Sequence, residues 1–477
     1  MNRAISRLFI VAVVLMVALM ANLVWIQVIR ARALQQAPQN HRILAQELRV
    51  RRGLIRAFDG SVIAGDVKHG AFYSRTYPQG PVAPQVVGYD SVRYGRSGIE
   101  QSMNGYLSGA KLGTSGLLDR ILGRRPVGAN VRLTIVPAVQ KAAQDALGRQ
   151  VGAIVALDPT TGAVIAAASS PDYDPARIDA AWKTLTKDPQ APLLSRTTQG
   201  LYPPGSSFKV VTATAALNLG KVTPTTPFDD TGTYRIYGGK VTNYHGEVFG
   251  AHDFTQALTY SINTTFGKVG TLLGQQALIA QMKAYGFYQV PPVELPPGMT
   301  LPSGRYALPK LLDPAAPMDP LAVAWAAVGQ ERILATPLQM ALVAAGVANG
   351  GQVMKPYLVQ DVTASGGRVL QRATPAVWTT AMSQATAQQL NLMMQQVVKA
   401  GTGTAAALQG IQVAGKTGTA QQAGASNVAW FIAFAPAEHP KVAVAVTIPN
   451  TVFTGGDVAA PLAAGVMRAA LDQPSLP

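Results

Sequence analysis

The residues best suited to chemistry in this chain are a serine and a lysine three positions apart, Ser206 and Lys209. On a helix this spacing puts both side chains on one face. A serine hydroxyl is a poor nucleophile until a base takes its proton. A lysine can be that base only when burial or a positive neighbour lowers its pKa. The pair predicts acyl transfer through Ser206, with Lys209 as the base.

A second motif, S-x-N, lies downstream at Ser261 and Asn263. It follows residues 254–260, which predict a short helix running into a loop. We expect Ser261 to relay a proton to a leaving amine. The Asn263 amide has donors and an acceptor, so it can hydrogen-bond Lys209 and also hold a substrate amide. An ordinary polar loop would carry the same letters, so this motif needs support from the others.

The third motif is the only K-T-G of the chain, at Lys416, Thr417 and Gly418. Lys416 could supply the second positive charge near the base. Gly418 would let a substrate backbone approach closely. Thr417 and Thr419 can bind a carboxylate. The Thr419 N–H could complete an oxyanion hole with the N–H of Ser206, and one such donor is worth roughly 10²–10³ in rate.

Local sequence predicts the elements that hold these motifs. Ser206 follows residues 202–205, which cannot be helical, and precedes the helical run 210–217, for which Gly220 is a plausible stop. Ser206 is therefore expected at a helix N-terminus, where free N–H groups favour developing negative charge. Lys416 comes after residues 411–414, a strand-like run, and a strand end with an exposed lysine is the less favoured alternative for K-T-G.

Each motif alone is weak, because a second set occurs in the same chain. Ser108 and Lys111 also read S-x-x-K, and Ser102 and Asn104 also read S-x-N. That set runs in the wrong order, is packed into a short stretch and has no K-T-G beside it. Only the series beginning at Ser206 has the order and wide spacing typical of serine acyltransferases that attack penicillin and the D-Ala-D-Ala ends of cell-wall peptides.

On these residues the chain resembles a class B penicillin-binding protein, over about residues 131–470. Further family-like segments are 152–162, 170–175, 329–330, 336–341, 348–351, 401–406 and 430–436. In its short N-terminal region and its alanine-rich composition, the chain is most similar to the actinobacterial penicillin-binding protein A group. Two positions depart from the usual pattern: Ser207 replaces a common threonine, and Ile262 puts a bulky side chain inside S-x-N.

The resemblance implies an α+β fold. It consists of a serine β-lactamase-like antiparallel sheet covered by helices, a small N-terminal pedestal domain and one transmembrane helix. Residues 131–477 would form the transpeptidase domain and residues 30–130 the pedestal, a dimerisation-like domain. Residues 59–60 are typical of a turn between two short strands. Residues 98–109 resemble a segment by which class B proteins form their pedestal, and residues 118–130 are interpreted as a linker.

Residues 8–29 form an uncharged, mostly apolar run long enough to cross a bilayer as one helix. Arg3 and Arg7 precede it and favour a cytoplasmic tail over residues 1–7, with the catalytic domain on the outer side. A cleaved signal peptide is the alternative, but residues 19–21 make a poor cleavage site because Leu19 is large. We therefore expect an uncleaved anchor in the cell membrane.

Composition excludes several chemistries. The chain has no cysteine, so disulfides and thiol catalysis are excluded. Its five histidines show no metal-binding spacing, and we predict neither a metal nor a cofactor. The formal net charge of +16 comes from dispersed residues without a nucleic-acid motif, so we expect attraction to anionic wall polymers and lipid headgroups and no binding of nucleic acid.

The leading functional hypothesis is a peptidoglycan D,D-transpeptidase inhibited by β-lactams, acting on the stem peptides of a lipid-linked precursor polymer. A D,D-carboxypeptidase or β-lactamase is the alternative, although the nearest downstream acid, Glu294, does not resemble the water-activating loop of class A β-lactamases. A β-lactam sensor is a third possibility, but no cytoplasmic signalling domain is present. About 100 residues before the catalytic domain cannot hold a glycosyltransferase, so the resemblance implies a RodA-like membrane polymerase as partner.

Overall fold

The computed structural model describes residues 2–29, 48–111, 127–421 and 426–477. Its central element is an antiparallel five-stranded sheet in the order β20-β21-β22-β7-β8. The strands are β20 (Ala414–Gln421), β21 (Asn427–Ala435), β22 (Val442–Thr451), β7 (Gly152–Leu157) and β8 (Val164–Ser170). As expected, the fold is an α+β sheet covered by helices, with β20 at one edge.

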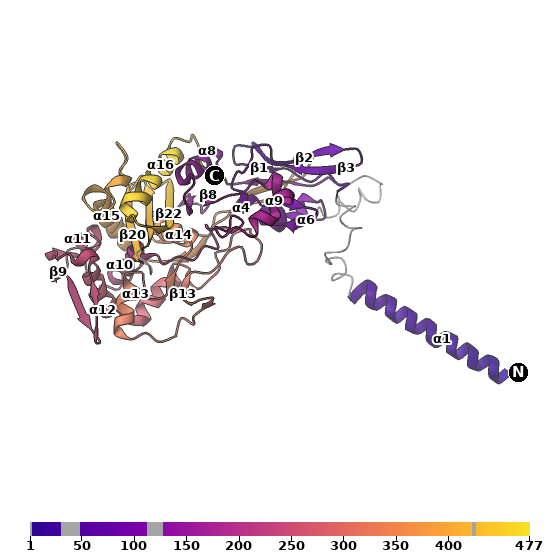
Figure 1. Ribbon diagram of the computed structural model, residues 1–477, viewed down its shortest axis with the longest axis horizontal. Coiled ribbons are helices and arrows are strands. Elements are labelled where there is room, and N and C mark those ends of the chain that lie inside the picture. The colour runs from indigo at the N-terminus through magenta and orange to yellow at the C-terminus, as the bar shows by residue number, and fades with distance from the viewer. Residues whose placement is uncertain (1, 30–47, 112–126, 422–425) are drawn as a thin grey trace.

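Strand β21 shows why this sheet needs helices on both faces, since all nine of its residues are buried. Alternate residues belong to two different hydrophobic clusters, as the two-residue period of a strand requires. One cluster packs against α10 (Lys209–Asn218) and α14 (Pro337–Ala348), and the other against α8 (Pro137–Leu147) and α16 (Ala460–Leu471). Figure 1 shows these helices around the yellow and orange strands of the sheet.

The active-site half of this domain is built from helices and short hairpins. These elements are η3 (Gly205–Phe208), β9 (Pro227–Asp230), β10 (Thr233–Ile236), β11 (Gly239–Thr242), β12 (Gly250–Asp253), α11 (Phe254–Thr259), α12 (Asn263–Ala284), α13 (Pro320–Ala327), α15 (Gln384–Ala400) and η6 (Gly455–Ala459). Further elements of the chain are η2 (Pro175–Arg177), α9 (Ile178–Leu185), η4 (Tyr244–Gly246), β13 (Gly304–Ala307), β14 (Lys310–Leu311), β15 (Ile333–Leu334), β16 (Gln352–Met354), β19 (Val377–Thr380) and η5 (Thr404–Ala406).

A second, six-stranded sheet joins the N-terminal region to the rest of the chain, in the order β18-β17-β6-β1-β2-β3. Its strands are β18 (Val369–Arg372), β17 (Val359–Thr363), β6 (Asn130–Leu133), β1 (Ile55–Arg56), β2 (Val62–His69) and β3 (Phe72–Thr76). Strand β6 lies inside this sheet, parallel to β1 and antiparallel to β17. The sheet therefore crosses the boundary expected at residue 131.

Other N-terminal expectations can be compared with the described residues. The turn at Asp59 and Gly60 lies between the antiparallel strands β1 and β2, as predicted. Residues 98–109 contain two short helices, α5 (Gly98–Ser102) and α6 (Asn104–Leu107). Helix α4 (Pro84–Val87) and the strands β4 (Asp90–Ser91) and β5 (Gly95–Arg96) complete the region. Residues 118–126 of the expected linker lie outside the described residues.

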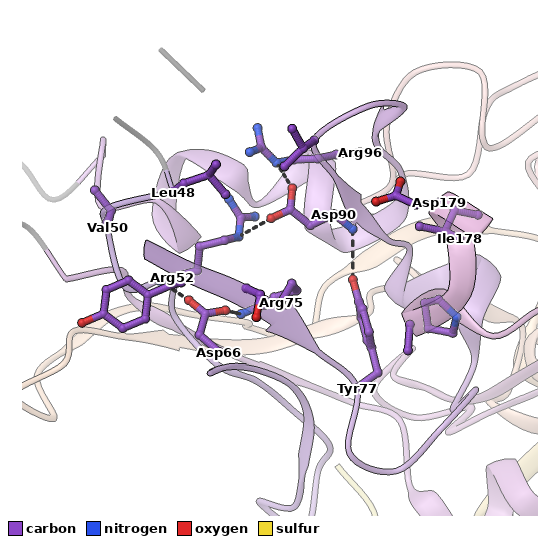
Figure 2. A pocket seen from close by; sticks show the side chains of 15 residues that line it. Leu48, Val50, Arg52, Asp66, Arg75, Tyr77, Asp90, Arg96, Ile178 and Asp179 are labelled. Atoms are coloured by element: carbon purple, nitrogen blue, oxygen red, sulfur yellow. Dashed lines mark hydrogen bonds and ion pairs between the residues drawn. The ribbon is translucent and has the colours of Figure 1, made fainter. Parts of the chain in front are cut away.

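A cavity of about 190 Å³ lies between this N-terminal region and α9 (Figure 2). Arg75 donates to Glu100 at 2.5 Å and to Asp66 at 3.0 Å, and Arg52 donates to Glu100 at 2.8 Å. All four of these side chains are buried, so each carboxylate needs the guanidinium beside it. The pedestal is therefore held together by paired charges as well as by apolar packing.

The first described helix, α1 (Asn2–Val24), continues into a π-helical turn, η1 (Trp25–Ile29). Residues 5–27 form the one described helix that is long and apolar enough to cross a membrane, with a mean hydropathy of 2.7 and no part buried. Figure 1 shows α1 standing clear of the folded body. A helix that is apolar all round and packs against nothing in water favours a lipid environment.

Candidate active site

Ser206 lies in the 3-10 turn η3, and α10 begins at Lys209. The turn presses against strand β20, because a Cβ added to Gly205 would come within 2.9 Å of the Ala420 nitrogen. Gly205 also has a φ of 51°, which favours glycine. The indole N–H of Trp430 donates to the Pro203 carbonyl at 2.9 Å and ties the preceding segment to β21. The nucleophile is thus held between α10 and the edge of the main sheet.

Lys209 is completely buried at the start of α10. Its amine donates to the carbonyl oxygen of Ser261 at 2.5 Å, to the Ser261 hydroxyl at 3.2 Å and to the amide oxygen of Asn263 at 2.6 Å. All three acceptors are neutral, so none of them compensates a buried positive charge. Burial, and secondarily the nearby Lys416, lower the pKa of Lys209 well below its ordinary value. This amine is therefore more easily present in its neutral, proton-accepting form than an exposed lysine.

The S-x-N motif lies where α11 gives way to α12. Ser261 has a φ of 63°, and Ile262 next to it is buried, so the bulky middle residue anchors this connection in the core. Asn263 is the first residue of α12. Its amide nitrogen donates to the Thr242 carbonyl at the end of β11, at 2.9 Å. The same side chain therefore faces Lys209 with its oxygen and β11 with its nitrogen.

Lys416 is also completely buried, and its amine donates to the Ser261 hydroxyl at 2.9 Å. It reaches the Thr417 carbonyl at 3.1 Å as well. Burial lowers the pKa of Lys416 to about 7. The strand here begins later than the strand-like run at residues 411–414 that was noted from sequence. Strand β20 begins at Ala414 and runs through the motif, because Lys416 pairs with Ile432 and Gly418 with Trp430 across the ladder to β21.

Gly418 faces the nucleophile turn so closely that no side chain would fit. A Cβ there would lie 2.7 Å from the Pro204 carbonyl oxygen and 3.0 Å from the Ser207 nitrogen. The neighbouring hydroxyls are already engaged. Thr417 shares a hydrogen bond of 2.6 Å with Thr402, and Thr419 accepts from the Gly455 N–H at 3.2 Å. The glycine therefore serves close packing of η3 against β20, in addition to any approach of a substrate backbone.

The structure brings four of the side chains singled out from sequence into one hydrogen-bonded group: Lys209, Ser261, Asn263 and Lys416. Ser206 and the backbone of β20 border it. The decoy motif is elsewhere, because Ser102 donates to the Glu294 carbonyl and Lys111 lies over the ring of Tyr106. The set that the structure brings together could be chosen from sequence because the order of the motifs, rather than their letters, carries the information.

Sequence reasoning missed two residues that border this group. Thr402 is exposed and meets Thr417, so it lies at the rim where a carboxylate would approach. Trp430 fixes the segment before the nucleophile. Both belong to segments noted only for their resemblance to the family. The glycines on either side of Thr402 were the available signal that the backbone makes a close approach there.

Comparison with protein families places this site in a known context. The model of the penicillin-binding protein transpeptidase domain matches residues 152–468, and the model of the penicillin-binding protein A dimerisation domain matches residues 52–131. The chain belongs to the penicillin-binding protein family. Its N-terminal match indicates the penicillin-binding protein A branch, in agreement with the resemblance noted from sequence.

Individual relatives of this penicillin-binding protein agree. It is 36% identical to the peptidoglycan D,D-transpeptidase PbpA of Mycolicibacterium smegmatis over the whole of both chains, and 34% identical to PbpA of Mycobacterium tuberculosis over 99% of each. Among solved structures it resembles penicillin-binding protein A of M. tuberculosis in its ceftriaxone acyl-enzyme complex, with a TM-score of 0.81, 34% identity, and coverage of 89% of this chain and 99% of that one. The D,D-transpeptidase domain of a peptidoglycan glycosyltransferase from Eggerthella lenta gives a TM-score of 0.79 at 36% identity, with the same coverage.

Proposed function

We propose that this protein is a peptidoglycan D,D-transpeptidase that cross-links stem peptides through an acyl-enzyme on Ser206 and is inhibited by β-lactams. The observation that carries the proposal is the convergence of two buried amines, Lys209 and Lys416, on the Ser261 hydroxyl beside the nucleophile turn. Relatives named as D,D-transpeptidases and solved as β-lactam acyl-enzymes support it.

In the acylation step, neutral Lys209 takes the proton of the Ser206 hydroxyl. The serine oxygen then attacks the carbonyl carbon of the penultimate D-Ala. The negative charge that develops on the carbonyl oxygen is held by the N–H groups of Ser206 and Thr419. Such preorganised donors act where charge appears, so they lower the barrier without costly rearrangement.

In the second half of this step, the bond to the terminal D-Ala breaks and its amine needs a proton. Ser261 is placed to pass one on, because its hydroxyl hydrogen-bonds both lysine amines. The amine of a neighbouring stem peptide then attacks the acyl-enzyme. Its proton returns by the same path, the new amide forms and Ser206 is released. This cycle restores the neutral Lys209 that began it.

Strand β20 offers the peptide a place to bind, because it is the edge strand of the main sheet. An extended substrate can add to such an edge through main-chain hydrogen bonds. Lys416, Thr417 and Thr419 lie along this strand and would hold the terminal carboxylate, with Gly418 between them. Asn263 would hold the side of the stem peptide that faces α12.

A hydrolase on the same fold is the competing function, and it needs a base that activates water. Glu294, the first acid downstream of S-x-N, accepts a hydrogen bond from the Leu358 N–H at 2.8 Å. Burial raises the pKa of its carboxyl above the ordinary value. The Glu294 carboxylate accepts its hydrogen bond from the backbone, outside the hydrogen-bonded group of Lys209 and Ser261. Its position therefore favours a transferase over a hydrolase.

We further propose the placement of the protein in the cell. Residues 8–29 would anchor it in the cell membrane with residues 1–7 on the cytoplasmic side. Residues 30–130 would form the pedestal and residues 131–477 the transpeptidase domain outside the cytoplasm. Glycan strands would come from a RodA-like membrane polymerase, which the pedestal would meet next to the bilayer.

Mass spectrometry of the penicillin-treated protein, with the adduct mapped to one peptide, tests the catalytic proposal. We expect a single adduct on Ser206, lost in Ser206→Ala and retained in Ser108→Ala, which alters the decoy motif. An adduct on Ser108, or undiminished labelling of Ser206→Ala, contradicts the proposal.

A further inference from the structure

Asp230, the last residue of β9, is a buried carboxylate with neutral partners. It is 1% exposed and accepts four hydrogen bonds. One oxygen takes the hydroxyl of Thr264 at 2.5 Å and the Gly232 N–H at 3.0 Å. The other takes the Asn243 amide at 2.7 Å and the Phe249 N–H at 2.9 Å. A buried charge held in this way organises every segment that points a donor at it.

Those segments are the ones that orient Asn263. The Asn243 side chain donates to Asp230 and accepts from the Thr264 N–H at 3.1 Å, so β11 and α12 are tied together through it. Thr264 directly follows Asn263 on α12. Thr242, whose carbonyl receives the Asn263 amide nitrogen, directly precedes Asn243. Asp230 therefore braces both the backbone that carries Asn263 and the backbone that accepts its hydrogen bond.

The orientation of the Asn263 amide matters because its two ends are chemically different. Its oxygen accepts from Lys209 at 2.6 Å, while its nitrogen donates to Thr242. A carbonyl oxygen can only accept, so the Thr242 contact keeps the nitrogen on that side and the oxygen on the lysine side. If β11 and α12 move apart, the amide can rotate and present donors to the Lys209 amine.

We propose that Asp230 is a positioning residue for acylation: it holds β11 and α12 so that Asn263 aims the Lys209 amine at the nucleophile. This inference rests on the roles proposed above for Lys209 and Asn263. Asp230 touches neither of these side chains and acts through Thr264, Asn243 and Thr242.

An asparagine cannot replace this carboxylate in either orientation. Each oxygen accepts from one backbone N–H, of Gly232 or Phe249, and a backbone N–H cannot turn round to become an acceptor. Whichever oxygen becomes an NH₂ group then faces a donor. Burial raises the pKa of Asp230, but the hydrogen bonds from Thr264, Phe249, Gly232 and Asn243 outweigh it and leave the pKa lowered. The group is therefore ionised at neutral pH.

The test is the time course of acylation of the full chain by penicillin, followed by intact mass at several drug concentrations. It yields the acylation rate constant k2, the binding constant Ks and the fraction of protein that is acylated. For Asp230→Asn we expect k2 to fall about ten- to a hundredfold, as small misplacements of catalytic groups do. Ks should stay within threefold and the final acylated fraction should match the parent. The matched control is Asp229→Asn, which makes the same chemical change at the exposed neighbouring residue and should leave all three values unchanged.

If Asp230 has only a structural role, Asp230→Asn should show a smaller acylated fraction of protein with the parental k2, and that result overturns the proposal. A parental k2 together with complete acylation of the protein also overturns it. If Asp230→Asn does not fold, Thr264→Val removes one donor and should lower k2, whereas Thr264→Ser keeps the hydroxyl and should restore it. Equal k2 in these two variants also overturns the proposal. Lys209→Ala distinguishes failure of the proposed function from failure of this inference. If Lys209→Ala is acylated at the parental rate, the base assigned in the proposed function is wrong. If Lys209→Ala is not acylated but Asp230→Asn has the same k2 as Asp229→Asn, only the inference about Asp230 fails.

Discussion

The Lys416 amine lies 2.9 Å from the Ser261 hydroxyl oxygen, and the Lys416 side chain is completely buried in strand β20. Lys209 approaches the same oxygen at 3.2 Å. The charge of Lys416 disfavours a second positive charge on Lys209 and contributes, after burial, to lowering the pKa of Lys209. The hydroxyl thereby connects a proton donor to a proton acceptor, which is the requirement for acyl transfer through Ser206.

Lys209→Ala should abolish acylation by penicillin without unfolding the protein. The substitution removes the proposed base, and a positioned base is worth about 10²–10⁴ in rate. Intact-mass labelling and the melting temperature are measured together, with Lys111→Ala of the decoy motif as the control. A Lys209→Ala protein that acylates within tenfold of the parent shows that another group deprotonates Ser206.

The acylation rate should fall as the pH drops through the pKa of Lys209, because a protonated amine cannot accept the serine proton. Lys416 contributes to the lowering of that pKa. In Lys416→Met the contribution is lost, the pKa of Lys209 rises, and the acid limb of the profile should move to higher pH. The measurement is the position of the limb, which is independent of the lower overall rate. A limb that stays in place contradicts the coupling of the two amines.

Lys416→Met should also stabilise the fold, most strongly near neutral pH and below. The pKa of Lys416 is about 7 in the folded protein, whereas an unfolded lysine titrates near about 10.4. Between these values the unfolded state binds more protons, so parental stability rises with pH. The melting temperature of the variant should exceed that of the parent by at least about 2 °C at pH 7, and the gap should close toward pH 10. If the difference in melting temperature between Lys416→Met and the parent does not depend on pH, burial of the Lys416 amine does not destabilise its charged form.

The penicilloyl adduct on Ser206 should last many minutes or longer. The hydrogen-bonded group of Lys209, Ser261, Asn263 and Lys416 contains no carboxylate that could activate water. Lys209 can act as the base for deacylation only when the incoming nucleophile is itself well placed. Decay of the labelled enzyme is followed by mass, and turnover of a thioester donor is measured with and without a D-amino acid or peptide amine. The amine should raise turnover of the thioester donor. Rapid catalytic clearance of penicillin would instead identify a β-lactamase.

Deletion of residues 1–29 should give a protein that remains in solution without detergent and is still acylated by penicillin. The deleted helix is apolar and makes no contribution to the site in the described part of the chain. Membrane association of the full chain and of the shortened one is compared by flotation with vesicles, with acylation as the control for folding. A shortened protein that folds but cannot be acylated would show that the proposed domain division is wrong.

The candidate site residues could be selected from sequence because the three motifs occur in one order and at wide spacing. Ser206 and Lys209 are fixed relative to one another by a helical turn, and only their order relative to Ser261 and Lys416 had to be read over longer distances. The strand-like run was placed at residues 411–414, before K-T-G, because Lys416 and Gly418 are poor strand formers. Their strand conformation comes from pairing with β21, which is a tertiary effect.

Asp230 and the mixed sheet show what sequence reasoning could not reach. A single aspartate carries no spacing signal, and its partners Asn243 and Thr264 come from separate elements. Strand β6 alternates polar and apolar residues like many strands, and nothing within it indicates that its neighbour is β17. Such pairings are settled by how the whole chain packs, so they become visible only in three dimensions.

Strand β6 is translated long before its neighbour β17. The six-stranded sheet that joins the N-terminal region to the rest of the chain is therefore incomplete during much of translation. Arg132 on β6 and its partner Asp361 on β17 are separated by 229 residues. At about 5–20 residues per second, synthesis leaves one edge of β6 open for on the order of 10–50 s. An open edge carries unpaired N–H and C=O groups that can recruit strands from other chains. The newborn protein is thus exposed to aggregation through this edge until β17, at residues 359–363, has been translated.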